Sequence, residues 1–185
     1  MPMTKHTLVV LAKDEPGVLN RTASLIRRRG FNIDSITVGH SEMSGFSRMV
    51  IIVDGATTAV EQVRKQLDKL VDIVKITDIS EEDVVDRELA LIKVEANSDT
   101  RSEIMEITDI FRANILDITP DSAMIEVTGD ASKVQSLIEL LRGFGITELA
   151  RTGRIAMARG VVGPLRHRTA KSKGKASRPT KASQS

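Results

Sequence analysis

A short turn between an apolar segment and an amphipathic segment carries the residues best suited to bind a ligand. It reads Asp14-Glu15-Pro16-Gly17-Val18-Leu19 and follows the apolar stretch 8–12. A glycine turn that opens a helix leaves several backbone N–H groups without acceptors, and these donors lie at the positive end of the helix dipole. The turn therefore predicts a socket for a carboxylate or another small anion.

A free amino acid would match this socket if its ammonium group also found oxygen acceptors. The carboxylate of Asp14 and the side-chain carbonyl of Asn32, at the start of the next apolar segment, can supply them. An aliphatic wall for a short branched side chain would come from Val18, Leu19 and Ile33. Spacing alone leaves the alternative open, because Gly17 also suits an ordinary turn and Asn32 an ordinary strand entry.

The segments around this turn alternate in the order of a ferredoxin-like fold. Apolar periodicity predicts a strand over 6–13, a helix over 17–29 and two strands over 33–39 and 48–53. A helix over 56–70 and a strand over 71–79 complete the unit. The first helix is expected to turn Leu19, Thr22, Ala23 and Ile26 inward and to end at Gly30 in the left-handed conformation. The predicted βαββαβ unit is an antiparallel sheet with both helices on one face.

The second half of the chain repeats this pattern. Asn114-Ile115-Leu116-Asp117-Ile118-Thr119 resembles Asn32-Ile33-Asp34-Ser35-Ile36-Thr37, and Met124-Ile125-Glu126-Val127 resembles Met49-Val50-Ile51-Ile52. We therefore predict an α+β protein with two ferredoxin-like modules, over 5–80 and 84–160, joined by the acidic segment 80–86. Chance similarity between two β-rich segments is the alternative explanation.

The positive net charge belongs to the end of the chain. Of 27 basic and 25 acidic residues, seven basic and no acidic ones lie in 166–185, so 1–165 carries 20 basic against 25 acidic residues. The segment 161–185 is predicted to be a disordered basic tail, because Ser, Thr, Ala and Lys bury too little surface to offset the loss of chain entropy. Its role is left open, although such tails can bind nucleic acid.

Catalytic and RNA-binding signatures are scarce in this sequence. The chain has no Cys, and its three His residues, His6, His40 and His167, show no metal-binding spacing. Adjacent acids such as Asp14 and Glu15 are more typical of helix capping than of acid–base catalysis. RNA-binding domains of this topology stack bases on sheet aromatics, whereas this chain has four Phe, no Tyr and no Trp. The sequence therefore argues against nucleic acid binding, and we expect no metal site.

The absence of Cys and of any apolar run near the ~20 residues needed to cross a bilayer favours a cytoplasmic protein.

Several motifs resemble one known family. The turn at 14–19 together with Arg29-Gly30-Phe31-Asn32-Ile33 is similar to the ACT domain, a regulatory module that binds amino acids. Gly30-Phe31-Asn32-Ile33-Asp34-Ser35-Ile36-Thr37-Val38, Arg87-Glu88-Leu89-Ala90-Leu91-Ile92-Lys93-Val94 and Glu148-Leu149-Ala150-Arg151-Thr152-Gly153 are more specific. They resemble the small regulatory subunits of acetolactate synthase (acetohydroxyacid synthase), and the resemblance covers about residues 5–160.

The resemblance implies an N-terminal ACT domain and a C-terminal ACT-like domain in a chain that is not catalytic by itself. It implies a homodimer formed through the ACT domain, with valine as feedback inhibitor, and leaves the preference among valine, leucine and isoleucine open. The effector residues it implies are Asp14, Gly17, Val18 and Leu19 of one chain, facing Asn32 and Ile33 of the other.

The implied partner is the catalytic large subunit, an enzyme of branched-chain amino acid biosynthesis. That subunit would bind thiamine diphosphate, FAD and Mg²⁺. A freestanding ACT regulator of transcription or of another enzyme is the alternative, and it should lack the motifs from Arg87 onward.

Overall fold

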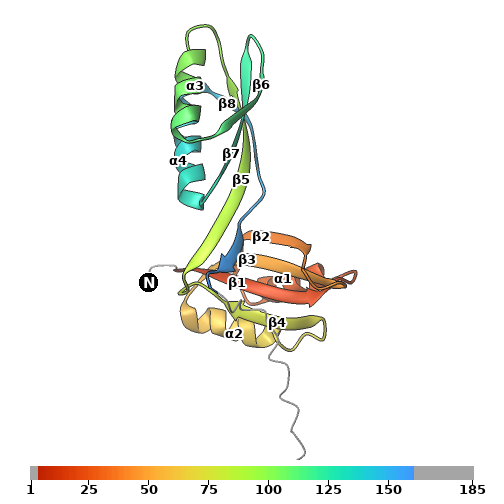
Figure 1. Ribbon diagram of the computed structural model, residues 1–185. Helices are drawn as coiled ribbons and strands as arrows, with labels where there is room; N and C mark the ends of the chain where they lie inside the picture. Colours follow the sequence, from red (N-terminus) through yellow and green to blue (C-terminus); the bar gives the residue numbers. More distant parts are fainter. Residues whose placement is uncertain (1–3, 161–185) are drawn as a thin grey trace, which may run out of the picture.

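The chain folds into two βαββαβ modules that lie one above the other in Figure 1. The computed structural model describes residues 4–160. The prediction of an α+β protein with two ferredoxin-like modules is confirmed. The predicted basic tail, 161–185, lies outside the described residues.

The N-terminal module has a four-stranded antiparallel sheet in the order β2-β3-β1-β4. Its elements are β1 Thr4–Lys13, α1 Val18–Arg28, β2 Asn32–His40, β3 Phe46–Gly55, α2 Thr57–Leu67 and β4 Ile73–Asp78. The first helix ends as predicted, because Gly30 has a φ of 77°, a conformation that residues with a Cβ rarely adopt. Basic residues Arg27 and Arg28 occupy its last turn, where they favour the negative end of the dipole.

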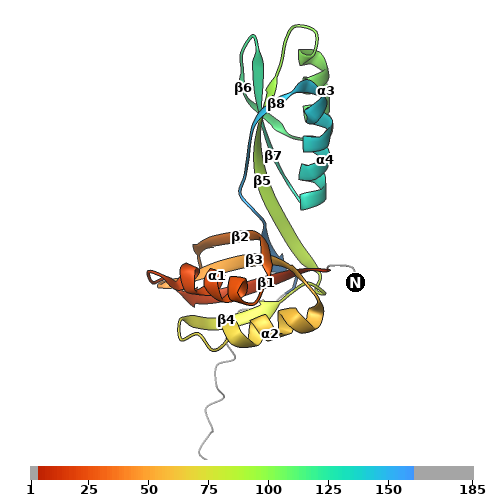
Figure 2. The ribbon, with the colours of Figure 1, turned by 180° about the vertical axis from the view of Figure 1, so that it is seen from behind.

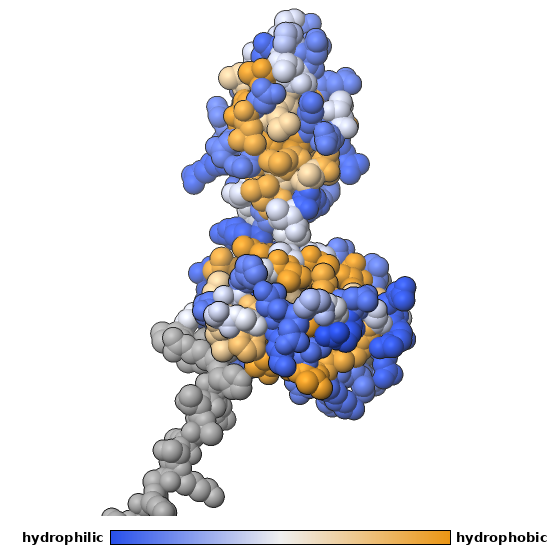
Figure 3. Space-filling view, turned by 90° about the vertical axis from the view of Figure 1, so that its right-hand side faces the viewer, coloured by the Kyte–Doolittle hydropathy of each residue, from blue (hydrophilic) through white to orange (hydrophobic). Residues whose placement is uncertain are grey.

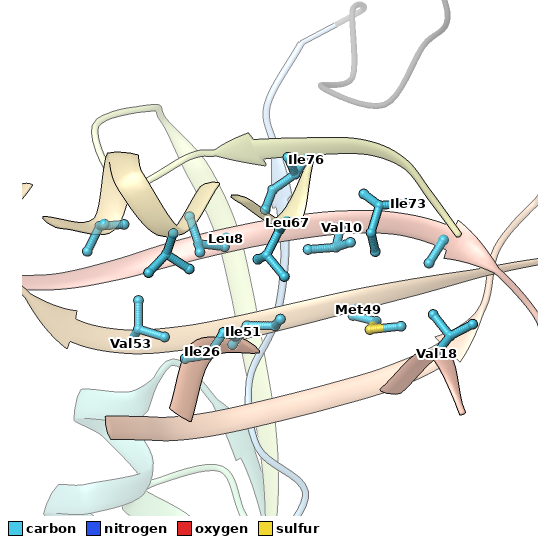
Figure 4. Packing of buried hydrophobic residues seen from close by; sticks show 13 residues of the cluster. Leu8, Val10, Val18, Ile26, Met49, Ile51, Val53, Leu67, Ile73 and Ile76 are labelled. Atoms are coloured by element: carbon cyan, nitrogen blue, oxygen red, sulfur yellow. The ribbon is translucent and has the colours of Figure 1, made fainter. Parts of the chain in front are cut away.

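The core of this module lies between the sheet and its two helices (Figure 4). Alternate residues of β1 and β3 point to the helices, as the period of two along a strand requires. These strands contribute Leu8, Val10, Ala12, Met49, Ile51 and Val53. The inward face of α1 consists of Val18, Thr22 and Ile26, four residues apart. The prediction that Leu19 faces inward is wrong, since its side chain is 44% exposed.

The C-terminal module repeats this architecture, with strands in the order β6-β7-β5-β8. Its elements are β5 Val84–Glu95, α3 Arg101–Ile110, β6 Asn114–Ile118, β7 Ser122–Gly129, α4 Ala131–Leu141, a 3₁₀ turn Arg142–Phe144, and β8 Ile146–Arg151. Asp130 caps α4 by accepting the Lys133 N–H at 2.8 Å. The sheet face away from the helices carries Leu91, Met124 and Ala150, and apolar residues are visible on this side of the module in Figure 3.

A fifth strand, β9 Ile155–Ala158, was not predicted from the sequence. It pairs with the first residues of β5, and the two-stranded β5–β9 ribbon descends from the C-terminal module onto the N-terminal sheet (Figures 1 and 2). The ribbon places Ala156 and Val84 against the sheet face opposite the helices, where Val9 and Ile52 are buried. Part of the segment predicted as a linker, 84–86, is therefore strand rather than loop.

Candidate functional site

The predicted anion socket lies where β1 ends and α1 begins. Gly17 is the residue that precedes the helix, with a φ of 84° that favours glycine. A Cβ at this position would lie 3.0 Å from Nη1 of Arg21, which is itself paired with Asp72 at 2.6 Å. The turn is thus held in a conformation that a side chain would disturb.

The start of α1 offers backbone donors, as predicted. Arg21 N–H donates to the Gly17 carbonyl at 2.9 Å, and Val18 N–H makes a long 3.4 Å contact to the Glu15 carbonyl. Within the part of the chain that the structure describes, the N–H groups of Leu19 and Asn20 have no acceptor. No side chain caps the helix, so the expectation that Asp14 or Glu15 caps it is wrong. These donors remain available at the positive end of the helix.

Asp14 is engaged within the protein. Its Oδ1 accepts the Ser47 hydroxyl at 2.9 Å, and its Oδ2 lies 3.2 Å from Nδ1 of His40. Its N–H donates to the Gly45 carbonyl at 2.9 Å. These contacts tie the turn to the hairpin between β2 and β3. The predicted role of Asp14 as an ammonium acceptor stays a prediction, and the geometry assigns it a part in positioning the Gly17 turn.

The other predicted residues, Asn32 and Ile33, lie at the start of β2 beside α1. They line an open hollow of about 390 Å³ together with Phe31 and four residues of the helix. The helix residues are Asn20, Ala23, Ser24 and Arg27. Sequence reasoning missed these four as site residues, although the polar ones recur at helical spacing along one face. Arg27 adds a cation that could meet a carboxylate, and Asn20 and Ser24 add polar groups.

The two halves of the predicted site do not meet within one chain. The helix α1 runs from the Gly17 turn to the Asn32 hollow, and its eleven residues span about 16 Å. Val18 belongs to the core, so only its backbone faces the turn, whereas Leu19 is exposed. Gly17 precedes this helix and Asn32 follows it, whereas Asn20 in its first turn also lines the hollow at Asn32.

A clasp between the modules lies further along β2. We use this name for the contacts of Ser35 and Thr37 with Gly153 and Arg154, which precede β9. The Arg154 N–H donates to Ser35 Oγ at 3.2 Å, and the Thr37 hydroxyl donates to the Arg154 carbonyl at 3.0 Å. Gly153 has a φ of 80°, and a Cβ there would lie 2.6 Å from Ser35 Oγ. The strand that begins with Asn32 is therefore bonded directly to the C-terminal half of the chain.

Ion pairs line the junction of the modules beside the clasp. A hollow of about 820 Å³ there contains both Lys5 and Asp34, which pair at 2.8 Å, and Glu88 with Arg151, which also pair. Arg154 pairs with Asp86 at 3.2 Å. Each of these ion pairs joins two residues of the same half of the chain, and each charge already has a partner of opposite sign.

Residues 4–160 contain neither a cluster of metal ligands nor a helix suited to a membrane. No three His, Asp or Glu side chains there lie close enough together to hold a metal ion. None of the helices in that range has the length and apolar character required to cross a membrane.

Both modules match models of known families. Residues 8–75 match the "AHAS small subunit-like ACT domain", and residues 87–160 match "Small subunit of acetolactate synthase". A probable acetolactate synthase small subunit of Archaeoglobus fulgidus is 55% identical over 156 residues, which are 84% of this chain and 98% of that protein. The chain belongs to the acetolactate synthase small-subunit family.

Other members of the acetolactate synthase small-subunit family are similar to this chain in sequence and structure over nearly the same range. The acetolactate synthase small subunit of Mycobacterium bovis is 47% identical over 155 residues, 84% of this chain and 92% of that protein. The crystal structure of the small subunit from Thermotoga maritima superposes with a TM-score of 0.78 at 46% identity, covering 86% of this chain and 99% of that one. The motifs from Arg87 onward, which a freestanding ACT regulator should lack, thus lie in a matched region.

Proposed function

We propose that this chain binds and activates the catalytic large subunit of acetolactate synthase and makes it sensitive to feedback inhibition by valine. Membership in the small-subunit family supports the partner. The observation that carries the effector proposal is the Gly17 turn, where backbone N–H groups of the described chain have no acceptor at a helix start. Valine presents the carboxylate and the short branched side chain that such a turn suits.

The effector would bind between two copies of the chain. Its carboxylate would take the N–H groups around Leu19 of one copy, and its ammonium group would meet Asn32 of the other. The placement of Gly17 before α1 and of Asn32 after it, with about 16 Å of helix between them, supports a site shared by two copies. Leucine and isoleucine remain competitors, because one methylene changes binding by only about 1–3 kcal/mol.

Inhibition would reach the large subunit as a coupling free energy. Couplings of this kind are typically about 1–3 kcal/mol, which corresponds to a 5- to 150-fold change in affinity. The clasp supplies a physical connection, because β2 carries Asn32 at one end and holds Arg154 through Ser35 and Thr37. The large subunit would carry thiamine diphosphate, FAD and Mg²⁺, and this chain would act by stabilising one of its states.

Substitution of Gly17 by Asp tests the proposal. A carboxylate at this position would compete with the carboxylate of valine for the same donors, and its Cβ would crowd Arg21. We expect the reconstituted holoenzyme with Gly17→Asp to stay active and to lose valine inhibition. Calorimetry on the chain alone and on the holoenzyme should show no heat on addition of valine to the variant.

Gly160→Asp is the matched control. Gly160 also has a positive φ, 97°, and a Cβ added there would have no atom within 4 Å among the described residues. This variant shares the backbone strain and the added charge, and it should keep valine inhibition. Full inhibition of the Gly17→Asp holoenzyme, or equal loss in both variants, would count against an effector site at the Gly17 turn.

A further inference from the structure

An apolar groove lies between the outer face of the N-terminal sheet and the β5–β9 ribbon. It has a volume of about 410 Å³ and is lined by residues of β2, β3, β5 and β9. Its aliphatic lining includes Val50, Val85, Ile155 and Met157, of which the last two are 57% and 64% exposed. Figure 3 shows apolar residues along the rim of the N-terminal module next to its junction with the C-terminal module. None of the predicted effector residues lines this groove.

Two guanidinium groups line the groove, and neither forms an ion pair within residues 4–160. The partly buried Arg48 donates from Nη2 to the Ala156 carbonyl at 2.8 Å, which occupies one of its five donors. Arg87 donates to the adjacent Asp86 carbonyl at 2.6 Å. Burial lowers the pKa of Arg48, and the charge of Glu42 offsets only part of this effect. A positive charge is thus held in apolar surroundings without a bonded anion.

Five arginines in the described range each form an ion pair with an Asp or Glu: Arg21, Arg64, Arg151, Arg154 and Arg159. Arg48 has no such partner within residues 4–160 and is partly buried beside aliphatic side chains. The groove also has no Asp or Glu among its lining residues. A ligand there would therefore meet positive charge and aliphatic carbon, and it would find no carboxylate to hold an ammonium group.

We propose that this groove binds a small aliphatic carboxylate that lacks an ammonium group. The hydrocarbon part of the ligand would pack against Val50, Ile155 and Met157, and burial of apolar surface would drive binding. The carboxylate would pair with the guanidinium of Arg48, and Arg87 would add to the positive potential. The groove volume falls within the range of small-ligand sites, roughly 300–1,000 Å³. This site is separate from the one proposed for valine and does not depend on it.

Hexanoate is the probe for this site, and the purified full chain is the protein. The methyl group of Met157 serves as the reporter, because methyl-labelled methionine gives one NMR signal per residue and Met157→Leu identifies its signal. We expect hexanoate to shift the Met157 signal with an affinity of about millimolar. Hexylamine should leave the signal in place, because its cation meets Arg48. Leucine should shift it more weakly, because its ammonium group finds no acceptor.

Substitutions at Arg48 distinguish recognition of the carboxylate by the guanidinium from non-specific hydrophobic binding. Arg48→Gln should weaken hexanoate binding by about tenfold or more, since a charge-assisted hydrogen bond is lost. Arg48→Lys keeps the charge and should weaken it less. Arg28→Gln is the control, because Arg28 is an exposed cation on α1 remote from the groove.

Two results would overturn the proposal. The first is equal binding of hexanoate and hexylamine, or unchanged hexanoate binding in Arg48→Gln, which would show that the guanidinium does not recognise the ligand. The second is a Met157 signal that ignores hexanoate and instead shifts with protein concentration. That result would assign the groove to contact with a second copy of the chain.

Discussion

Gly153→Ala is the substitution that most directly tests how the two modules are joined. Gly153 sits in the clasp with a φ of 80°, and a Cβ there would lie 2.6 Å from Ser35 Oγ and 3.0 Å from Thr37 Oγ1. Both hydroxyls belong to β2, whose backbone is fixed by its pairing with β3. The new methyl group must therefore push the segment 153–154, which connects β8 and β9, away from β2.

The expected cost has two parts. Placing Ala in the left-handed region costs about 1–2 kcal/mol, and the reduced entropy of the unfolded chain returns about 0.4–1 kcal/mol. Displacement of Arg154 breaks its two hydrogen bonds to Ser35 and Thr37, each worth about 0.5–1.5 kcal/mol. Gly45→Ala shares only the backbone part, because no atom lies within 4 Å of the Cβ position. Gly153→Ala should thus be less stable than Gly45→Ala by about 1–3 kcal/mol.

Urea denaturation followed by far-UV circular dichroism is the suitable assay, because the chain has no Trp or Tyr for fluorescence. Ser35→Ala provides the second arm of a double-mutant cycle. It removes the hydroxyl that the new methyl group would strike, so its own cost should shrink in the Gly153→Ala background. Equal free energies of unfolding for Gly153→Ala and Gly45→Ala, with strictly additive effects of Ser35→Ala, would refute the clasp as a source of stability.

Two further predictions concern the cores and caps. Ile51→Ala should lower the free energy of unfolding by about 2–5 kcal/mol, because the side chain is fully buried between β3 and the helices, and an unchanged urea midpoint would contradict this packing. Asp130→Ala should lower the thermal midpoint at neutral pH, because the Ser132 hydroxyl and the Lys133 N–H donate to the Asp130 carboxylate and lower its pKa below the ordinary value. A carboxyl group with a lowered folded-state pKa stabilises the fold above its unfolded pKa and loses this contribution as the pH falls through the folded value, so the gap between Asp130→Ala and the parent chain should close in acid. A gap that stays constant down to low pH would rule out this assignment.

Local sequence patterns were sufficient for most of the fold. Alternating residues in 6–13 and 48–53 and the glycine at 30 belong to elements whose periodicity and capping are local properties. Sequence reasoning assigned both Val18 and Leu19 to a ligand and placed Leu19 on the inward face of α1, whereas Val18 packs into the core and Leu19 is exposed. The helical pattern in the sequence gives the spacing of the buried residues, but it does not decide between two sets of residues that differ by one position.

The return strand β9 and the clasp could not be predicted, because their partners are distant in the chain. The four residues of β9 hold only Ile155 and Met157 as large side chains. Both are more than half exposed and line the groove beside the N-terminal sheet, while Ala156 is buried against that sheet. The positive φ of Gly153 gives a local reason for a turn but does not reveal Ser35, 118 residues earlier. Tertiary contact, which no local propensity encodes, decides these features.

The candidate site also combines features that the local sequence predicts with features that depend on tertiary packing. The Gly17 turn and Asn32 were recognisable from motif spacing, whereas the hollow next to Asn32 depends on how α1 packs against β2. Asn20, Ser24 and Arg27 recur at helical spacing, yet this pattern is also typical of a solvated helix face. Only the placement of α1 beside the start of β2 distinguishes a ligand-binding helix face from a solvated one.

The ribbon beneath the N-terminal sheet has a consequence for shorter relatives. Val9, Leu11, Val50 and Ile52 form an aliphatic layer that packs against Ile79 of the same half and against Val84 and Ala156 of the following half of the chain. An N-terminal piece that ended before Val84 would expose this layer and tend to aggregate. A protein that uses such a module alone must instead carry polar side chains at the positions of Val9, Leu11, Val50 and Ile52, or bury this layer against another chain.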